Sequence, residues 1–372
     1  MTDGVEGYFA LDYAIPTRFI IPPLSHSPVD ISRKKPSYPL TPELRQYLRD
    51  YDREAPLPIT YEDLRHFSNS FPLLDRTGND TLWQTVFFEP QALRELSQGL
   101  TEVYALLKTA GDLSFTEHLI ADRIDYCQFG NSNPFRVRIV NQFNDNYDYF
   151  YVKKADASRL YGLELEHLLS PNSMNFLVHG DTLIEEHIAG IPGDDFIRLR
   201  LSQPHINQVR IAKEFVKFNE RCFVRLLGDM RAYNYVIDVT PDFEDEQYRV
   251  RAIDFDQQSY EGRRIMYLPQ FFKDNAAVVE MCARLLKPET LRQYQTEERA
   301  LMARRARAER HRLRDLLDVM RRHDLAPPEK VAQLKAELNR FHRTEAFDKC
   351  DSMGDVVRQN LWLMLGASAK PA

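Results

Sequence analysis

The sequence predicts an α+β protein in which a small lobe of antiparallel strands precedes a larger helical lobe. Three β-rich runs follow one another between Asp125 and Lys154, separated first by a loop rich in Gly, Asn, Ser and Pro and then by an Asn/Asp turn. A helical run comes next, "DASRLYGLELEHLLSP", which Pro171 ends. After a further strand-loop-strand unit over residues 224–256, the pattern is mainly helical to the end of the chain.

The composition is that of an ordinary folded protein and excludes several classes. With 372 residues, 43% of them hydrophobic and 28% charged, the chain can bury a large core, unlike a disordered protein or a small disulfide scaffold. Its four cysteines lie far apart without a Cys-x-x-Cys pair, which argues against a zinc site. The sequence lacks an apolar run of about 18 residues, so no membrane partner is expected. The acidic start "MTDGVEGYFALDY" is unlike a signal peptide, and a cytoplasmic protein is expected.

Residues 1–118 are expected to form a mostly helical N-terminal extension. Its first part is rich in proline, and helical patterns follow, such as "TPELRQYLRDYD" and "EPQALRELSQGLTEVYALLKTAG". Thr41, followed by Pro42 and Glu43, has the pattern of a helix N-cap with proline tolerated in the first turn. We expect this extension to pack against the rest of the protein.

Residues 291–372 are expected to form an arginine-rich helical C-terminal extension. Between Arg299 and His323 there are nine arginines and three acidic residues, although the whole chain has a net charge of −6. Nucleic acid is therefore not expected as a partner of the whole protein. Apolar spacing favours a packed amphipathic helix with a solvated arginine face; the apolar residues are Leu313, Leu316, Leu317 and Met320. The alternative is that either extension contacts a protein partner or an anionic substrate.

The clearest chemical pattern lies in "GDMRAYN" and "AIDFD". Asp229 stands five residues before Asn234, and Asp254 follows where the second strand of a β-hairpin would return it. Phosphoryl transfer from ATP needs oxygen ligands for Mg²⁺, a cation on the phosphates and a group that orients the acceptor hydroxyl. An aspartate at the end of an apolar strand is costly if buried without a counter-ion, which favours a metal site at Asp254. Taken alone, Asp229 and Asn234 would indicate only a capped turn.

These motifs resemble the protein kinase-like superfamily, and within it the branch of aminoglycoside phosphotransferases, choline kinases and fructosamine kinases. That branch combines a Gly-Asp-x-x-x-x-Asn loop with an Ile-Asp-Phe-Asp strand, and "GDMRAYN" and "IDFD" match both. The resemblance implies that Asp229 is the catalytic base and that Asn234 and Asp254 bind Mg²⁺. It also implies that Arg231 steadies the transferred phosphate. The chain departs from the family at Leu227, where a histidine is usual.

The preceding segment resembles the small lobe of that superfamily, in the order strand, phosphate loop, strand, strand with lysine, and helix with glutamate. The loop "FGNSNPF" would cover the phosphates of ATP through Gly130, Asn131 and Ser132, although it holds a single glycine where the family pattern has three. Lys153 is the expected phosphate-binding lysine. Lys154 is the alternative, because successive side chains of a strand point to opposite faces and only one of the two lysines can face inward.

The helix and strand after this lysine complete the implied nucleotide site. Glu164 is the expected ion-pair partner of the lysine, with Glu166 second. The stretch "LIEEHIAGIPGDDF" resembles the hinge between the lobes, where backbone groups from Glu186 to Ile188 would hydrogen-bond adenine.

The expected function is a phosphotransferase that depends on ATP and Mg²⁺ and acts on a hydroxyl of a small molecule. Its kinase-like small lobe would span 119–190, and its helical lobe, with the catalytic and metal loops, 191–290. The stretch "QQSYEGRRIMYLPQFF" lacks an Ala-Pro-Glu signature, which favours a small-molecule acceptor. The alternatives on the same fold are a protein kinase, an enzyme that transfers AMP, and a catalytically silent binding module.

Overall fold

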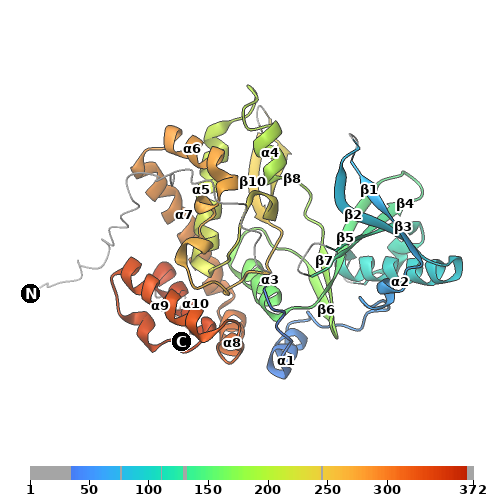
Figure 1. Cartoon of the computed structure of the whole chain (residues 1–372), viewed down its shortest axis with the longest axis horizontal. Coiled ribbons are helices and arrows are strands. Elements are labelled where there is room, and N and C mark those ends of the chain that lie inside the picture. The colour runs from blue at the N-terminus through green and yellow to red at the C-terminus, as the bar shows by residue number, and fades with distance from the viewer. Residues whose placement is uncertain (1–34, 76–77, 110, 129–131, 244–245, 367–372) are drawn as a thin grey trace, which may run out of the picture.

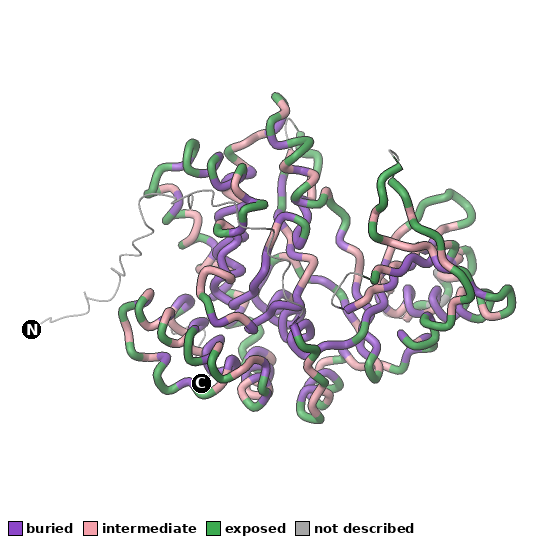
Figure 2. Tube along the Cα trace, viewed as in Figure 1, coloured by how far each residue is buried: buried purple, intermediate pink, exposed green. Residues whose placement is uncertain are grey.

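The protein has two hydrophobic cores, one in a part dominated by a β-sheet and one in a helical part (Figures 1 and 2). The structure is a computed structural model and describes residues 35–75, 78–109, 111–128, 132–243 and 246–366. In Figure 1 the larger sheet lies at the right and most of the helices at the left. The α+β class predicted from the sequence is confirmed.

A seven-stranded sheet, antiparallel throughout, forms the first part. Its order is β1-β2-β3-β4-β5-β7-β6. The strands are β1 (Asn69–Leu74), β2 (Asp80–Phe87), β3 (Leu119–Cys127), β4 (Phe135–Asn141), β5 (Tyr147–Lys154), β6 (Phe176–His179) and β7 (Thr182–Glu186).

The described part of the N-terminal segment contains strands besides the expected helices, because β1 and β2 form a hairpin that extends this sheet. In the ladder between β2 and β3, Trp83 pairs with Cys127 and Val86 with Ile124. The stretch "DTLWQTVF" is rich in the β-branched and aromatic residues that favour strands. Helix α2 (Pro90–Thr109) does form as predicted, and its apolar side chains share a core with the sheet.

The chain passes from the large sheet to a smaller one through residues 187–190. The smaller sheet has the order β10-β9-β8, and its strands are β8 (Ile191–Pro192), β9 (Tyr235–Pro241) and β10 (Glu246–Ala252). Helix α3 (Ala157–Leu169) lies between β5 and β6 in the sequence and packs against the helical part.

Helices form most of the second part. They are α4 (Gly193–Leu199), α5 (Gln208–Arg225), α6 (Ala276–Leu285), α7 (Pro288–Ala308), α8 (Arg310–Arg321), α9 (Pro328–His342) and α10 (Met353–Leu365). The N-terminal helix α1 (Pro42–Asp50) packs on α8. The predicted cap of α1 is confirmed, since the Thr41 hydroxyl accepts the N–H of Leu44 at 3.2 Å. None of the described helices is long and apolar enough to cross a membrane.

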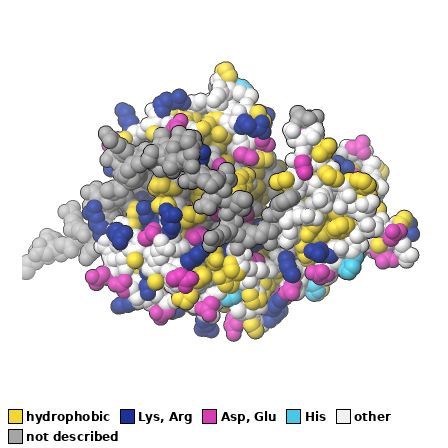
Figure 3. Space-filling model, viewed as in Figure 1, with side chains coloured by type: hydrophobic (Ala, Val, Ile, Leu, Met, Phe, Trp, Pro, Cys, Tyr) yellow, Lys and Arg dark blue, Asp and Glu magenta, His cyan; other side chains and the backbone are white. Residues whose placement is uncertain are grey.

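The arginine-rich stretch forms α7 and α8, which pack into the core. The predicted apolar face is buried, and it comprises Leu313, Leu316, Leu317 and Met320. Some arginines of this stretch turn inward and are only partly exposed: Arg312 bonds Glu164, and Arg305 donates to the carbonyl of His167 at 2.9 Å. On the face shown in Figure 3, Lys and Arg side chains are interspersed with Asp and Glu.

Candidate functional site

The loop between α5 and β9 carries Asp229 and Asn234 and is held by hydrogen bonds to its backbone. Asp229 has a φ of 56°, in the left-handed region, and its N–H donates to the carbonyl of Met266 at 3.1 Å. Nδ2 of Asn234 donates to the Asp229 carbonyl at 2.7 Å. A non-glycine residue at positive φ is strained and persists only where its surroundings fix it. These bonds therefore fix the positions of both side chains.

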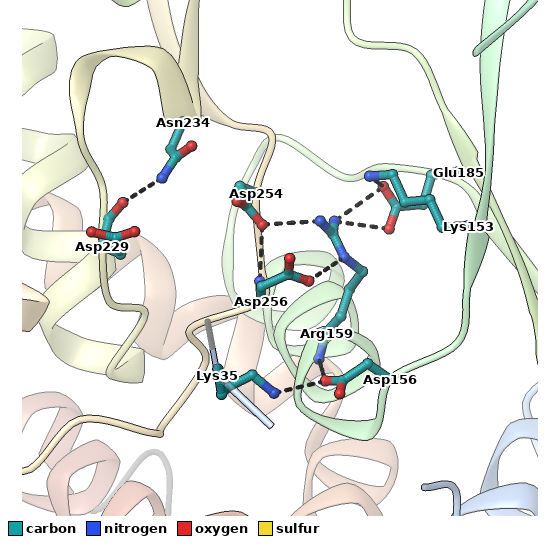
Figure 4. A network of polar contacts seen from close by, with 9 residues as sticks. All are labelled: Lys35, Lys153, Asp156, Arg159, Glu185, Asp229, Asn234, Asp254 and Asp256. Carbon is teal, nitrogen blue, oxygen red and sulfur yellow. Dashed lines mark hydrogen bonds and ion pairs between the residues drawn. The ribbon is translucent and has the colours of Figure 1, made fainter. Parts of the chain in front are cut away.

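The β9–β10 hairpin brings Asp254 to this loop, as the sequence pattern predicted. Tyr235 pairs with Ala252 in the ladder, and the N–H of Ile253 donates to the carbonyl of Asn234 at 3.0 Å. Asp254 comes directly after this bond, and Figure 4 shows it on the segment next to the loop.

Asp229 is buried, with 8% of its surface exposed, and is paired with Arg231. Nε of Arg231 donates to Oδ1 of Asp229 at 3.0 Å, whereas Oδ2 has no hydrogen-bond donor among the described residues. Burial raises the pKa of Asp229 to about 6, although Arg231 opposes this shift. A carboxyl group with this pKa is mostly ionised at neutral pH and can accept a proton through Oδ2.

Lys153 is the inward-facing lysine of β5, and its neighbour Lys154 is exposed. Nζ of Lys153 lies 2.5 Å from Oε2 of Glu185, which is on β7. The pairing follows from the sheet register, because Lys153 is opposite Leu183 and Glu185 lies two residues further on the same face. Burial lowers the pKa of Lys153, so its charged form depends on Glu185.

The predicted ion pair of this lysine with Glu164 or Glu166 is wrong. Glu164 has no exposed surface, and its carboxylate accepts hydrogen bonds from the side chains of Tyr47, Arg53 and Arg312. Glu166 is ion-paired with Arg225 of α5. Both glutamates of α3 are therefore ion-paired with groups outside the β-sheet.

Arg159, in the first turn of α3, links the Lys153–Glu185 pair to Asp254 and Asp256, which follow β10 (Figure 4). Its guanidinium donates to Oε1 of Glu185 at 3.0 Å, to Oδ1 of Asp254 at 2.9 Å and to Oδ1 of Asp256 at 2.7 Å. Burial opposes ionisation of Asp256, but Arg159 and Lys153 outweigh it and hold the pKa of Asp256 below its ordinary value. Burial and the charge of Asp256 raise the pKa of Asp254.

One carboxylate oxygen of Asp254 is open to a ligand. The side chain of Asp254 is 32% exposed, and both bonds that it accepts, from Arg159 and from the N–H of Asp256, fall on Oδ1. Its Oδ2 receives no bond within the described part of the chain. No group of three or more His, Cys, Asp or Glu side chains among the described residues could hold a metal. Mg²⁺ on a nucleotide needs only one or two protein oxygens, because phosphates and water supply the others.

The predicted phosphate loop joins β3 to β4, but Gly130 and Asn131 lie outside the described residues. Ser132 is buried and lines a cavity of about 80 Å³ that Lys154 and Asp256 also line. Lys35, from the segment before α1, lines the same cavity. The described end of this loop therefore lies near Asp256, one of the carboxylates that Arg159 bonds.

The predicted hinge residues lie at the end of β7. The N–H of Glu186 donates to the carbonyl of Asn175 at 3.0 Å, and its carboxylate accepts from Lys108 at 2.9 Å. Ile188 is buried in the helical core. An adenine contact in this stretch would therefore fall to the backbone of His187 and Ile188, since the N–H of Glu186 is already bonded.

Two residues of the site, Arg159 and Glu185, were missed from the sequence. Glu185 follows Leu183 and Ile184 in an apolar strand, and it is 2% exposed. A carboxylate that is buried without a counter-ion is costly, and this argument singled out Asp254 in the sequence. The same argument could have singled out Glu185. Arg159 gave no comparable signal, because an arginine in a first helical turn is usually exposed.

Comparison with known proteins identifies no family. No protein-family model matches the chain, and a search of curated proteins finds no significant match.

Proposed function

We propose that the chain transfers the γ-phosphoryl group of ATP, with Mg²⁺, to a hydroxyl of a small molecule. The observation that carries this proposal is the convergence of Asp229, Asn234 and Asp254 on one loop and one hairpin. The strands from β3 to β7, with α3 between β5 and β6, also follow the order that the kinase-like resemblance implies. A buried lysine on β5 is available for the phosphates.

In the proposed reaction, Oδ2 of Asp229 takes the proton of the acceptor hydroxyl. The hydroxyl oxygen forms a bond to the γ-phosphorus, the bond from that phosphorus to the β,γ-bridging oxygen breaks, and ADP leaves. Because the pKa of Asp229 is about 6, the base is ionised at neutral pH and releases the proton to water afterwards. Arg231 lies beside Asp229, where its charge can stabilise the transferred group.

Lys153 would bind the α- and β-phosphates, and Asn234 Oδ1 with Asp254 Oδ2 would hold the metal. When bound, Mg²⁺ offsets the charge of the phosphates and helps to orient them. Backbone groups of His187 and Ile188 would bind adenine.

A small-molecule acceptor is favoured by the segment after Asp256. This segment forms short 3₁₀ turns that pack on the catalytic loop, with Tyr267 fully buried and the Met266 carbonyl bonded to Asp229. It lacks the Ala-Pro-Glu signature of protein kinases.

A silent kinase-like binding module is the second candidate, and one observation favours it. Arg159 bonds the same Asp254 that would hold the metal, and the lysine pairs with Glu185 in place of a helix glutamate. The two candidates differ in whether ATP is consumed.

The test is the nucleotide product formed from ATP and Mg²⁺, separated by chromatography. We expect slow release of ADP by the wild type, in which water replaces the acceptor, and a loss of about 10²–10⁴-fold in Asp229→Asn. Asp238→Asn, on β9 of the same hairpin, is the matched control and should keep the rate. Release of AMP would instead indicate adenylyl transfer, and no product above the Asp229→Asn level would favour the silent module.

A further inference from the structure

Arg159 places a cation between the two aspartates that follow β10. Its side chain is 4% exposed and donates to Asp254, Asp256 and Glu185. Arginine keeps its charge in proteins at any physiological pH. The chain itself therefore offsets part of the negative charge of these carboxylates.

The position of this cation is fixed by the start of α3. Oδ1 of Asp156, the N-cap, accepts the N–H of Arg159 at 3.3 Å and the ammonium of Lys35 at 3.0 Å. The second oxygen of Asp156 accepts the N–H of Tyr38 at 2.7 Å. These contacts tie the helix start to the segment before α1 and fix the backbone from which the Arg159 side chain extends.

The charge balance of the cluster depends on Arg159. Three carboxylates, those of Glu185, Asp254 and Asp256, face two cations, Lys153 and Arg159. Without Arg159 they would face one ammonium, and like charges repel strongly where water is largely excluded. An excess of carboxylate oxygens is also what attracts a divalent cation.

We propose that Arg159 is a specificity-determining residue, which makes the site reject free Mg²⁺ and accept the metal only together with a nucleotide. A free divalent cation at Oδ2 of Asp254 would meet the guanidinium on Oδ1 of the same carboxylate and the nearby ammonium of Lys153. The triphosphate of a nucleotide carries several negative charges that offset these cations, so the metal and the phosphates enter as one unit. The inference rests on the proposed function, and Arg159 acts through Asp254.

The test is the binding of free Mn²⁺ without nucleotide, followed by electron paramagnetic resonance. We expect Arg159→Met to bind Mn²⁺ at least about tenfold more tightly than the wild type, because the competing charge is gone. Arg221→Met is the matched control, since Arg221 is equally buried and pairs with Glu298 at 3.0 Å outside the cluster. Adding Asp254→Asn to Arg159→Met should remove the gain. No gain in Arg159→Met, or a gain that survives Asp254→Asn, would overturn the proposal.

A second measurement uses the wild type, so it tests the proposal even if Arg159→Met does not fold. The affinity for Mn²⁺ should rise at least about tenfold when a non-hydrolysable ATP analogue is present. If the analogue binds, equal affinity for Mn²⁺ with and without it would overturn the role of Arg159. Failure of the proposed function looks different: the analogue would not bind to any variant, while Arg159→Met would still gain affinity for free Mn²⁺.

Discussion

Helix α3 carries two buried charge clusters that differ in how completely they are closed. In the middle of the helix, Glu164 has no exposed surface and is bonded by one tyrosine and two arginines. At its start, Arg159 is bonded to three carboxylates, and one of them, Asp254, is 32% exposed.

On the proposed function, this difference separates a structural role from a role in nucleotide binding. The closed cluster joins α3 to α1 through Tyr47 and to α8 through Arg312, so it ties both extensions to the rest of the protein. The open cluster has an accessible carboxylate oxygen and lies beside the loop of Asp229. The predictions below test whether changes at the closed cluster lower stability and changes at or near the open cluster alter nucleotide binding.

The largest expected effect is on stability, in Glu164→Gln. This change leaves Arg53 and Arg312 without their carboxylate, and breaking a buried ion pair costs about 3–5 kcal/mol. Urea unfolding measures the loss, and Glu289→Gln on the exposed side of α7 is the control. A loss below about 1 kcal/mol would mean that this cluster does not hold the extensions.

Asp229, beside the open cluster, should make stability depend on pH. Burial raises its pKa from 3.8 to about 6, so between these values the folded state keeps a proton that the unfolded chain has lost. The stability from protonated Asp229 is complete below the unfolded pKa and is lost as pH rises through about 6, by at most about 3 kcal/mol. Urea unfolding across this range should show that the difference between wild type and Asp229→Asn falls with rising pH. A difference independent of pH would refute the raised pKa.

Lys153→Met should weaken ATP binding with little effect on stability. A charged hydrogen bond to phosphate contributes about 1.5–3 kcal/mol, so the dissociation constant should rise about 10–100-fold. Stability should change little, because Arg159 still donates to the carboxylate of Glu185 when the lysine is removed. Calorimetric titration compares it with Lys154→Met, the exposed neighbour. A larger loss in Lys154→Met would reverse the assignment of the two lysines.

The smallest expected effect is that of Tyr51→Phe, between α1 and α8. It removes a hydrogen bond of 2.7 Å from Tyr51 to Asp315, which contributes about 1 kcal/mol. Thermal unfolding should show this loss, and ATP affinity should stay unchanged. A change in affinity would show that the extension contacts influence the site.

The sequence predicted local structure correctly where polar motifs stand next to clear strand patterns. The hairpin that returns Asp254 to Asn234 could be predicted, because the two motifs flank two strand patterns. The partner of Lys153 could not be predicted, because the helix glutamates are nearer in the sequence and only the sheet register selects Glu185. The β1–β2 hairpin was missed because its alternating residues lie inside a segment with stronger helical patterns.

The measurement that tests the central claim most directly is a thermal shift with ATP, with and without Mg²⁺, on the wild type and on Asp254→Asn. At about a hundred times its dissociation constant, a ligand of the folded state adds roughly 2.7 kcal/mol, which is readily seen. We predict a stabilisation by ATP that needs Mg²⁺ in the wild type and is lost in Asp254→Asn. No shift with ATP and Mg²⁺, or an equal shift in Asp254→Asn, would contradict a nucleotide site at the open cluster.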